Sequence, residues 1–202
     1  MNTMRCNKNG FTLVEMIIVI AIYTLVMFAL FTSVTSFYRY NAYAVAQSYQ
    51  VNQARRGMEA FVRDVREMTY ADDGTYPLAR IESNLIGFYS DIDRDDSVEY
   101  VEYEHSSTTL QERIYSATGT PPVYGATPEE TRILSEYVQN IGQGTSTFEY
   151  FDANGDLATA STTVTDIVYV TAKIIVNIDP VRDPGEFMLK SSAALRNLKP
   201  NQ

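Results

Sequence analysis

The feature that most constrains this chain is an apolar run near its N-terminus with a single carboxylate at its start. From Met16 to Phe31 the sequence has no charge and no proline, and Glu15 stands directly before this run. As a helix, residues 11–31 extend about 30 Å, which is one hydrocarbon thickness. A charged side chain in such a segment costs roughly 3 kcal/mol on insertion scales and usually marks function. Glu15 is therefore the first candidate functional residue.

The helix is expected to continue well beyond the apolar run. The first proline of the chain is Pro77, so nothing obliges the helix to break before it. Gly57 weakens the helix locally by about 1 kcal/mol. Steps of three and four residues place six apolar side chains on one helical face. This stripe consists of Val51, Ala54, Met58, Phe61, Val65 and Met68. We therefore predict a membrane-length helix over residues 11–31 and an amphipathic continuation over residues 32–70.

The remaining residues, 71–202, predict a β-rich domain. Short runs with strand-like composition alternate with turn-rich segments. The expected strands cover residues 81–89, 97–103, 108–115, 148–151, 164–178 and 186–195. Residues 119–128 are expected to form a loop, residues 129–141 a helical or irregular segment, and Asn154-Gly155 a hairpin turn of type I′. The predicted fold class is α+β, with the long N-terminal helix packed on a mostly antiparallel sheet.

The N-terminal pattern resembles the class III signal peptide of type IV pilins and pseudopilins. Its core is the sequence Gly10-Phe11-Thr12-Leu13-Val14-Glu15, followed by the apolar run. The resemblance implies that a prepilin peptidase removes residues 1–10 as a leader by cutting between Gly10 and Phe11. It also implies that Phe11 becomes N-methylated and that Glu15 sets the assembly register by pairing with the N-terminal amine of a neighbouring subunit.

Secondary motifs resemble the minor pseudopilins of the J type and the related W-type minor pilins. They are Arg63-Asp64-Val65-Arg66, the hairpin at residues 148–155 and Leu195-Arg196-Asn197-Leu198. Position 32 is a threonine, with no proline nearby, whereas major pilins often carry a helix-kinking proline there. The resemblance therefore implies a non-enzymatic minor subunit that is assembled into, or caps, a type IV pilus or a pseudopilus of the type II secretion kind.

The charges that flank the apolar run predict its orientation in the cytoplasmic membrane. Arg5 and Lys8 precede the run, and the next cation is Arg39. By the positive-inside rule, the N-terminus lies in the cytoplasm and residues 71–202 lie outside it. Tyr38 and Tyr40 around Arg39 are typical of a membrane interface. The expected partners are the membrane, prepilin peptidase and other pilin or pseudopilin subunits, and the final location is the filament.

Composition argues against several other classes of function. The formal net charge is −9, and the leader holds two of the cations, so no direct contact with nucleic acid is expected. The one cysteine, Cys6, lies in the predicted leader, which excludes thiol catalysis by the mature chain. A single histidine, His105, supports neither a Ser–His–Asp triad nor a zinc site. His105 is expected in a loop or at a strand end.

An acidic segment offers one candidate metal site. Asp91, Asp93, Asp95 and Glu102 match four positions of an EF-hand-like calcium loop. The sixth position is Asp96, where the sharp turn of such a loop needs glycine, and the flanking segments read as strands. Two interpretations stay open. Either the segment is a solvated acidic loop and the protein has no cofactor, or some of these carboxylates form a weak calcium site.

Three alternatives to a filament subunit also remain. An ordinary signal peptide needs a small-residue cleavage site, which residues 32–36 match only loosely. A single-span anchored, extracytoplasmic ligand-binding domain would have no filament role, and an exported hydrolase would rely on paired carboxylates. Only the pilin-like interpretation predicts a methylated Phe11. The sequence does not distinguish among secretion, adhesion or motility, and DNA uptake as the process served.

Overall fold

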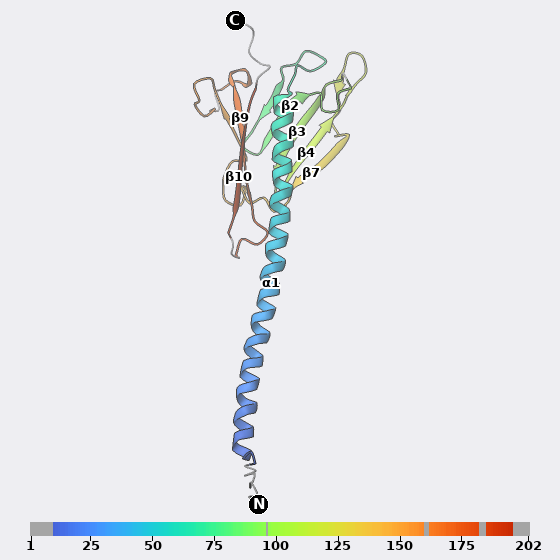
Figure 1. Ribbon diagram of the computed structural model, residues 1–202. Coiled ribbons are helices and arrows are strands. Elements are labelled where there is room, and N and C mark those ends of the chain that lie inside the picture. The colour runs from blue at the N-terminus through green and yellow to red at the C-terminus, as the bar shows by residue number, and fades with distance from the viewer. Residues whose placement is uncertain (1–9, 96, 160–161, 182–184, 196–202) are drawn as a thin grey trace, which may run out of the picture. The chain divides into compact units, whose positions relative to one another are not determined.

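The computed structural model describes residues 10–95, 97–159, 162–181 and 185–195. Figure 1 labels its long helix and main strands. The chain divides into two compact units, Met1–Val45 and Ala46–Gln202, and the boundary falls inside one helix. The fold class is α+β, as predicted, because one long N-terminal helix is combined with antiparallel β-sheets.

Helix α1, Leu13–Arg66, contains 54 residues. In the described part of the chain, it is the one helix long and apolar enough to cross a membrane. Its threonine hydroxyls donate back to carbonyl oxygens of the preceding turn, as Thr24 does to Ala21 at 2.9 Å. Such bonds satisfy polar groups inside an apolar helix. The helix ends at Arg66, four residues before the predicted end, because Met68 instead forms an isolated β-bridge with Ser90.

In the second unit, five residues of the predicted apolar stripe belong to the hydrophobic core: Ala54, Met58, Phe61 and Val65 of α1, and Met68 just after it. All six side chains of the stripe are at most 8% exposed. Phe61 lies at the centre, with its ring centroid 5.2 Å from that of Tyr103 and 5.5 Å from that of Phe148. These two aromatic residues come from different sheets, so the helix joins both sheets into one core. The opposite face of α1 is exposed and bears Arg55, Arg56, Glu59, Arg63 and Arg66.

The larger sheet has five antiparallel strands in the order β1-β2-β3-β4-β7. Their bounds are β1 Leu78–Ile81, β2 Leu85–Ser90, β3 Glu99–Ser106, β4 Thr109–Tyr115 and β7 Glu130–Ser135. Phe88, Val101 and Leu110 point toward the core, and each is at most 2% exposed. Tyr100, Glu102 and Glu104 alternate with the core-facing residues of β3 and lie on the other face.

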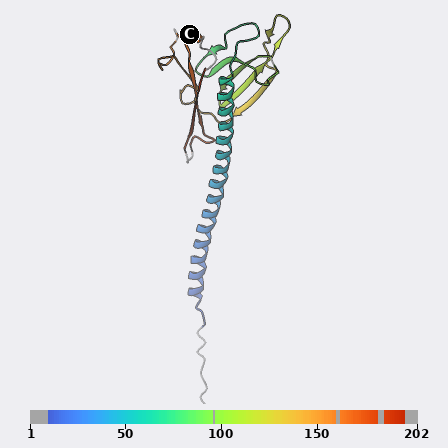
Figure 2. The same ribbon diagram turned by 45° about the horizontal axis from the view of Figure 1, so that its top comes forward.

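The smaller sheet has the order β10-β9-β8. Its strands are β8 Phe148–Phe151, β9 Tyr169–Val176 and β10 Phe187–Ala194, and Figure 2 shows the sheets from a second direction. A 3-10 turn, η1 Val164–Asp166, precedes β9, and the short strands β5 Ala117–Thr118 and β6 Val123–Tyr124 form a separate hairpin. Gln47 of α1 donates to the carbonyl of Val176 at 3.0 Å and accepts from the N–H of Ile178 at 3.1 Å. This amide fixes the end of β9 to the helix.

The structure corrects three local predictions. The strand predicted over residues 81–89 is interrupted, because Ile81 ends β1 and the chain turns before β2 begins at Leu85. The segment predicted as helical or irregular contains β7, which pairs with β4. At Asn154-Gly155, glycine alone has a positive φ, of 85°, so the turn is not of type I′. It closes instead through a 3.1 Å bond from the N–H of Gly155 to the carbonyl of Asp152.

Candidate functional sites

The first candidate site is the start of α1. Gly10 and Phe11 precede the helix, and Phe11 is 79% exposed. The Glu15 carboxylate accepts from the Thr12 N–H at 2.8 Å and from the Thr12 hydroxyl at 3.0 Å. The hydroxyl oxygen of Thr12 in turn accepts from the N–H of Glu15 at 3.2 Å. This reciprocal arrangement is a capping box, which satisfies N–H groups that the first turn of a helix leaves free.

Sequence reasoning missed the capping box, although Thr-x-x-Glu before an apolar run is its signature. The box begins two residues after Gly10, so a cut between Gly10 and Phe11 leaves both Thr12 and Glu15 in the mature chain. Glu15 therefore has a local hydrogen-bond partner in addition to the intermolecular partner predicted for it. The cleavage site, the methylation of Phe11 and the assembly role of Glu15 stay predictions.

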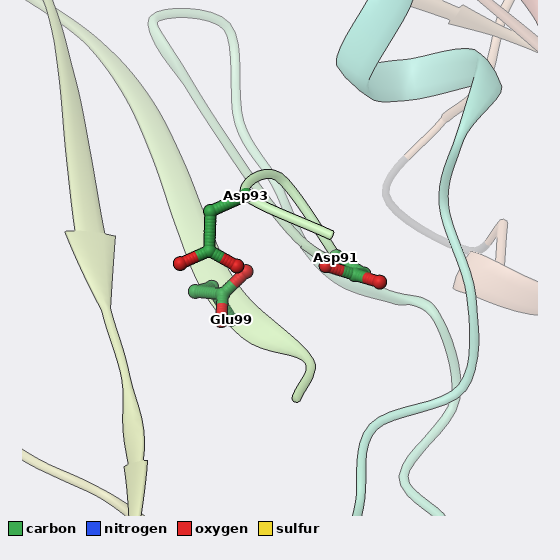
Figure 3. Close-up of side chains that lie close together, drawn as sticks. All are labelled: Asp91, Asp93 and Glu99. Atoms are coloured by element: carbon green, nitrogen blue, oxygen red, sulfur yellow. The ribbon is translucent and has the colours of Figure 1, made fainter. Parts of the chain in front are cut away.

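The second candidate site is the acidic loop between β2 and β3. Asp91, Asp93 and Glu99 each offer a carboxylate oxygen within 4.8 Å of the others. Figure 3 shows the carboxylates of Asp93 and Glu99 facing one another, with Asp91 beside them. The loop is also held by its own backbone, since Asp91 accepts from the N–H of Arg94 at 2.7 Å. The oxygen-rich set suits a hard cation such as calcium.

Glu99 is the buried member of this set, at 5% exposed. Burial raises the pKa of its carboxyl above the ordinary value, and the negative charges of Asp93, Asp95 and Asp91 add to this effect. The N–H of Ile92, 3.0 Å from the carboxylate, acts in the opposite direction. The side chain lines a cleft of about 540 Å³ whose walls carry mostly negative charge. Its carboxylates belong to Asp93, Asp95, Glu99, Glu129 and Glu130.

Glu102, the fourth predicted ligand, is not in this set. It lies on the opposite face of β3 from Glu99, because side chains alternate along a strand. Its carboxylate accepts from the Tyr100 hydroxyl at 2.9 Å, and it forms an ion pair with Arg80 at 3.0 Å. The Tyr115 hydroxyl donates to its second oxygen at 3.2 Å. The structure therefore joins Asp91 and Asp93 with Glu99 rather than with Glu102, and Asp95 lines the adjacent cleft.

A buried polar cluster links α1 to the larger sheet. The hydroxyl oxygen of Tyr103 on β3 lies 2.6 Å from Asp64 of α1 and 2.9 Å from Glu112 of β4. All three residues are at most 2% exposed. A phenol carries one hydrogen, so it can donate to only one of the two carboxylates. The other carboxyl must hold a proton of its own to hydrogen-bond to the phenol oxygen.

An arginine lies beside each of the two carboxyl groups of this cluster. Arg63 lies 3.0 Å from Asp64, and Arg132 lies 3.5 Å from Glu112. Burial raises the pKa of the Glu112 carboxyl, and the charge of Asp64 raises it further, against the opposing effects of Tyr103 and Arg132. Burial and both carboxylates raise the pKa of Tyr103 well above its ordinary value. Sequence reasoning missed this cluster, since Glu112 resembles any exposed charge in an alternating strand.

Comparison with known protein families gives a match at the N-terminus. Residues 5–31 match the prokaryotic N-terminal methylation motif. This motif is the class III signal peptide of type IV pilins, and it includes the whole segment from Gly10 to Glu15. The motif indicates a likeness to type IV pilins and pseudopilins at the N-terminus, and the α+β fold with its long N-terminal helix is pilin-like in architecture. Searched against curated proteins, the chain has no match.

Proposed function

We propose that this chain is a non-enzymatic minor pilin or pseudopilin, assembled into or capping a type IV pilus or a pseudopilus of the type II secretion kind. The observation that carries the proposal is the match of residues 5–31 to the methylation motif. The matched segment includes the start of α1, from Leu13 to Phe31, and α1 is long and apolar enough to cross a membrane. Prepilin peptidase cuts between Gly10 and Phe11 and methylates the new N-terminus. The domain after the helix lies outside the cytoplasm.

Glu15 acts as the assembly residue. A carboxylate among apolar side chains needs a compensating charge, and the N-terminal amine of a neighbouring subunit supplies one. The capping box supports this role, since the Thr12 N–H and hydroxyl hold the Glu15 carboxylate in the first turn of α1. A carboxylate that is already oriented loses less side-chain entropy when it pairs.

Two features support a minor rather than a major subunit. Thr32 lies inside the uninterrupted helix α1, where major pilins often have a kinking proline. The segments Arg63-Asp64-Val65-Arg66 and 148–155 resemble those of J-type and W-type subunits. In the first of these segments, Asp64 and Val65 are buried against the sheets. The third segment, residues 195–198, extends beyond the described residues after Leu195.

The test is the chemical state of the N-terminus. The full chain is expressed with prepilin peptidase, and mass spectrometry of the purified protein should find a chain that begins with N-methylated Phe11. Gly10→Val should leave the leader attached. A single-span anchored domain with no filament role predicts an unmodified N-terminus, so an unprocessed wild-type chain would overturn the proposal.

A second measurement tests assembly separately from processing. Glu15→Ala and Glu15→Leu should be processed normally and should be depleted from sheared filaments or cross-linked pseudopili. The wild-type chain provides the reference for incorporation in the same cells. If both variants are incorporated at the wild-type level, the role assigned to Glu15 is wrong, even when Phe11 is methylated.

A further inference from the structure

The cleft lined by Glu99 carries an excess of negative charge. Its volume is about 540 Å³, and its walls come from the β2–β3 loop, the start of β3, the end of β4 and the start of β7. In the described part of the chain, Arg132 is the one cation that lines it. Such a cleft attracts positively charged groups. The five carboxylates of its walls belong to Asp93, Asp95, Glu99, Glu129 and Glu130.

The arginine of the cleft is already bound to other carboxylates. Its Nε and one terminal nitrogen donate to Glu130 at 2.6 Å and 2.5 Å, and its other terminal nitrogen lies 3.5 Å from Glu112. Arg132 therefore does not compensate the rest of the cleft. Across the residues that the structure describes, four carboxylates of the cleft have no ion pair within 4.0 Å. They belong to Asp93, Asp95, Glu99 and Glu129.

Glu99 presents an unpaired carboxylate oxygen to this cleft. The residue is 5% exposed, and its carboxylate faces that of Asp93 (Figure 3). Oε2 accepts from the N–H of Ile92 at 3.0 Å, whereas Oε1 accepts no hydrogen bond from any described residue. A buried carboxylate without a counter-charge is costly. Its free oxygen therefore points to a cationic donor from outside the chain.

The apolar part of the cleft suits a long side chain better than a bare ion. Ile92, Ile114 and Ala117 contribute to its walls beside the carboxylates. Arginine packs its aliphatic stem on such surfaces while its charged head stays with polar groups. Calcium instead needs about six to eight oxygen atoms around one point, whereas these carboxylates are spread over separate segments of the chain.

The facing carboxylates of Asp93 and Glu99 indicate the head group that fits. Their oxygens lie within 4.8 Å of one another and of an Asp91 oxygen. A guanidinium is planar and carries five N–H donors in a fork, so it can bond to two carboxylates at once. An ammonium group has a single nitrogen and cannot span two carboxylates in this way. The cleft therefore favours arginine over lysine.

We propose that this cleft binds an arginine side chain of a neighbouring protein. The guanidinium donates to the free oxygen of Glu99 and to Asp93, and the aliphatic stem lies against Ile92 and Ile114. Glu129, which is exposed, adds long-range attraction that speeds the encounter. The preference for arginine rests on the cleft alone, whereas the identification of the neighbour as another filament subunit rests on the proposed function.

The binding test uses the full-length chain in a non-ionic detergent, with EDTA to remove calcium. The probe is the end-capped peptide Gly-Ser-Gly-Arg-Gly-Ser-Gly with an uncharged fluorescent label, followed by fluorescence anisotropy. The matched control peptide has citrulline in place of arginine, because citrulline has nearly the same shape and no charge. We expect the arginine peptide to bind about tenfold more tightly, and its affinity to fall as the salt concentration rises.

Three variants locate the binding site. Glu99→Gln keeps the size of the side chain and an acceptor for the N–H of Ile92, and it should weaken binding of the arginine peptide about tenfold. Glu129→Gln, at an exposed position, should weaken it about threefold and leave the fold intact, so the test stays decisive if Glu99→Gln destabilises the chain. Glu136→Gln, which is exposed and follows the other end of β7, removes the same charge and should have no effect.

Photo-cross-linking from Ser97, which lines the cleft, identifies the neighbour in cells that assemble the chain. The cross-linked peptide should contain arginine, and its yield should fall in Glu99→Gln and Glu129→Gln. Equal binding of the two peptides, unchanged binding in the cleft variants that fold, calcium binding without peptide binding, or a cross-linked peptide without arginine would overturn the proposal. If the arginine peptide binds as expected but Phe11 is unmethylated, the filament proposal fails and the cleft proposal stands.

Discussion

A β-carbon added to Gly57 of α1 would lie 2.9 Å from the β-carbon of Leu134 on β7 and 3.2 Å from its carbonyl oxygen. Real β-carbons almost never approach other heavy atoms within 3.0 Å. The helix and the edge of the larger sheet are therefore in contact at a point where only glycine fits. This contact explains why position 57 is a glycine, although glycine in a helix interior costs about 1 kcal/mol relative to alanine.

Gly57→Ala should destabilise the protein although alanine favours helices. Overpacking costs roughly 1–3 kcal/mol, and the gain in helix propensity offsets about 1 kcal/mol of it. We expect the free energy of unfolding to fall by about 1 kcal/mol, measured by urea titration of the detergent-solubilised chain with tyrosine near-UV circular dichroism. Asn52→Ala, on the exposed face of the same helix, should be neutral or stabilising. Equal effects of the two substitutions would contradict the close contact.

Tyr103→Phe should destabilise the buried cluster. The phenol oxygen bridges Asp64 and Glu112, and without it two buried carboxyl groups lose a hydrogen-bond partner. The expected loss in the free energy of unfolding is about 1–3 kcal/mol. Tyr89→Phe is the matched control, since Tyr89 packs against Tyr100 and Tyr124 and its hydroxyl has no hydrogen bond within the described residues. A Tyr103 variant as stable as the Tyr89 variant would show that the bridge contributes nothing.

Glu112→Gln should make the stability of the protein less dependent on pH. The folded state raises the pKa of Glu112, so folding favours the protonated carboxyl. This contribution is fully present below the ordinary value of 4.5 and is lost as the pH rises through the folded-state pKa. Glutamine cannot ionise, so the variant should lose less stability than the wild type between pH 4.5 and neutrality.

Unfolding curves at a series of pH values check this prediction. Glu99, whose pKa is also raised, contributes a dependence of the same sign, so Glu99→Gln should remove a further part of it. Glu136→Gln, at an exposed position, serves as the control substitution. A steeper loss of stability with rising pH in Glu112→Gln than in the wild type would mean that folding lowers, rather than raises, the pKa of Glu112.

The calcium prediction is tested most sharply with Glu99 and Glu102. Glu99 lies with Asp91 and Asp93, whereas Glu102 is held by arginine and tyrosine side chains on the other face of β3. We expect weak binding, with a dissociation constant of about 10⁻⁴–10⁻³ M by isothermal titration calorimetry. Glu99→Gln should weaken it several-fold, and Glu102→Gln should leave it unchanged. If calcium titration of the wild type releases or absorbs no binding heat, the solvated-loop interpretation is correct.

Much of the fold could be predicted because its signals are local and repeated. The apolar stripe from Val51 to Met68 follows the helical period closely, and all of its members are buried. The strand conformation of β7 could not be predicted in this way. Leu134 and its neighbours are compatible with helix or strand, and pairing with β4 decides between them. Such pairing depends on residues far apart in the sequence, which local propensity does not report.

The candidate sites differ in the same respect: a site within one continuous segment could be predicted, and a site assembled from separate elements could not. The motif from Gly10 to Glu15 is contiguous, so the sequence alone identified it. The calcium-loop spacing grouped Asp91 and Asp93 with Glu102, whereas in the structure the carboxylate of Glu99 lies beside them and Glu102 lies on the other face of β3. The cluster around Tyr103 joins three elements, α1, β3 and β4, so no spacing within one segment could reveal it.

Thr12→Ala should separate the orientation of Glu15 from its charge. The alanine variant keeps the carboxylate but loses the hydroxyl that bonds to it at 3.0 Å, and the loss of a helix cap costs about 1 kcal/mol. If the cap orients Glu15 for assembly, incorporation into filaments should fall about fivefold in Thr12→Ala, with leader removal unchanged.

Thr12→Ser retains the hydroxyl and should restore wild-type incorporation. The measurements are the ratio of filament-bound to membrane-bound subunit and the mass of the mature N-terminus, determined for both variants and for Glu15→Ala. Normal incorporation of Thr12→Ala beside a defective Glu15→Ala would mean that assembly depends on the carboxylate but not on the capping box. Defective processing of Thr12→Ala would instead place Thr12 in recognition by the peptidase.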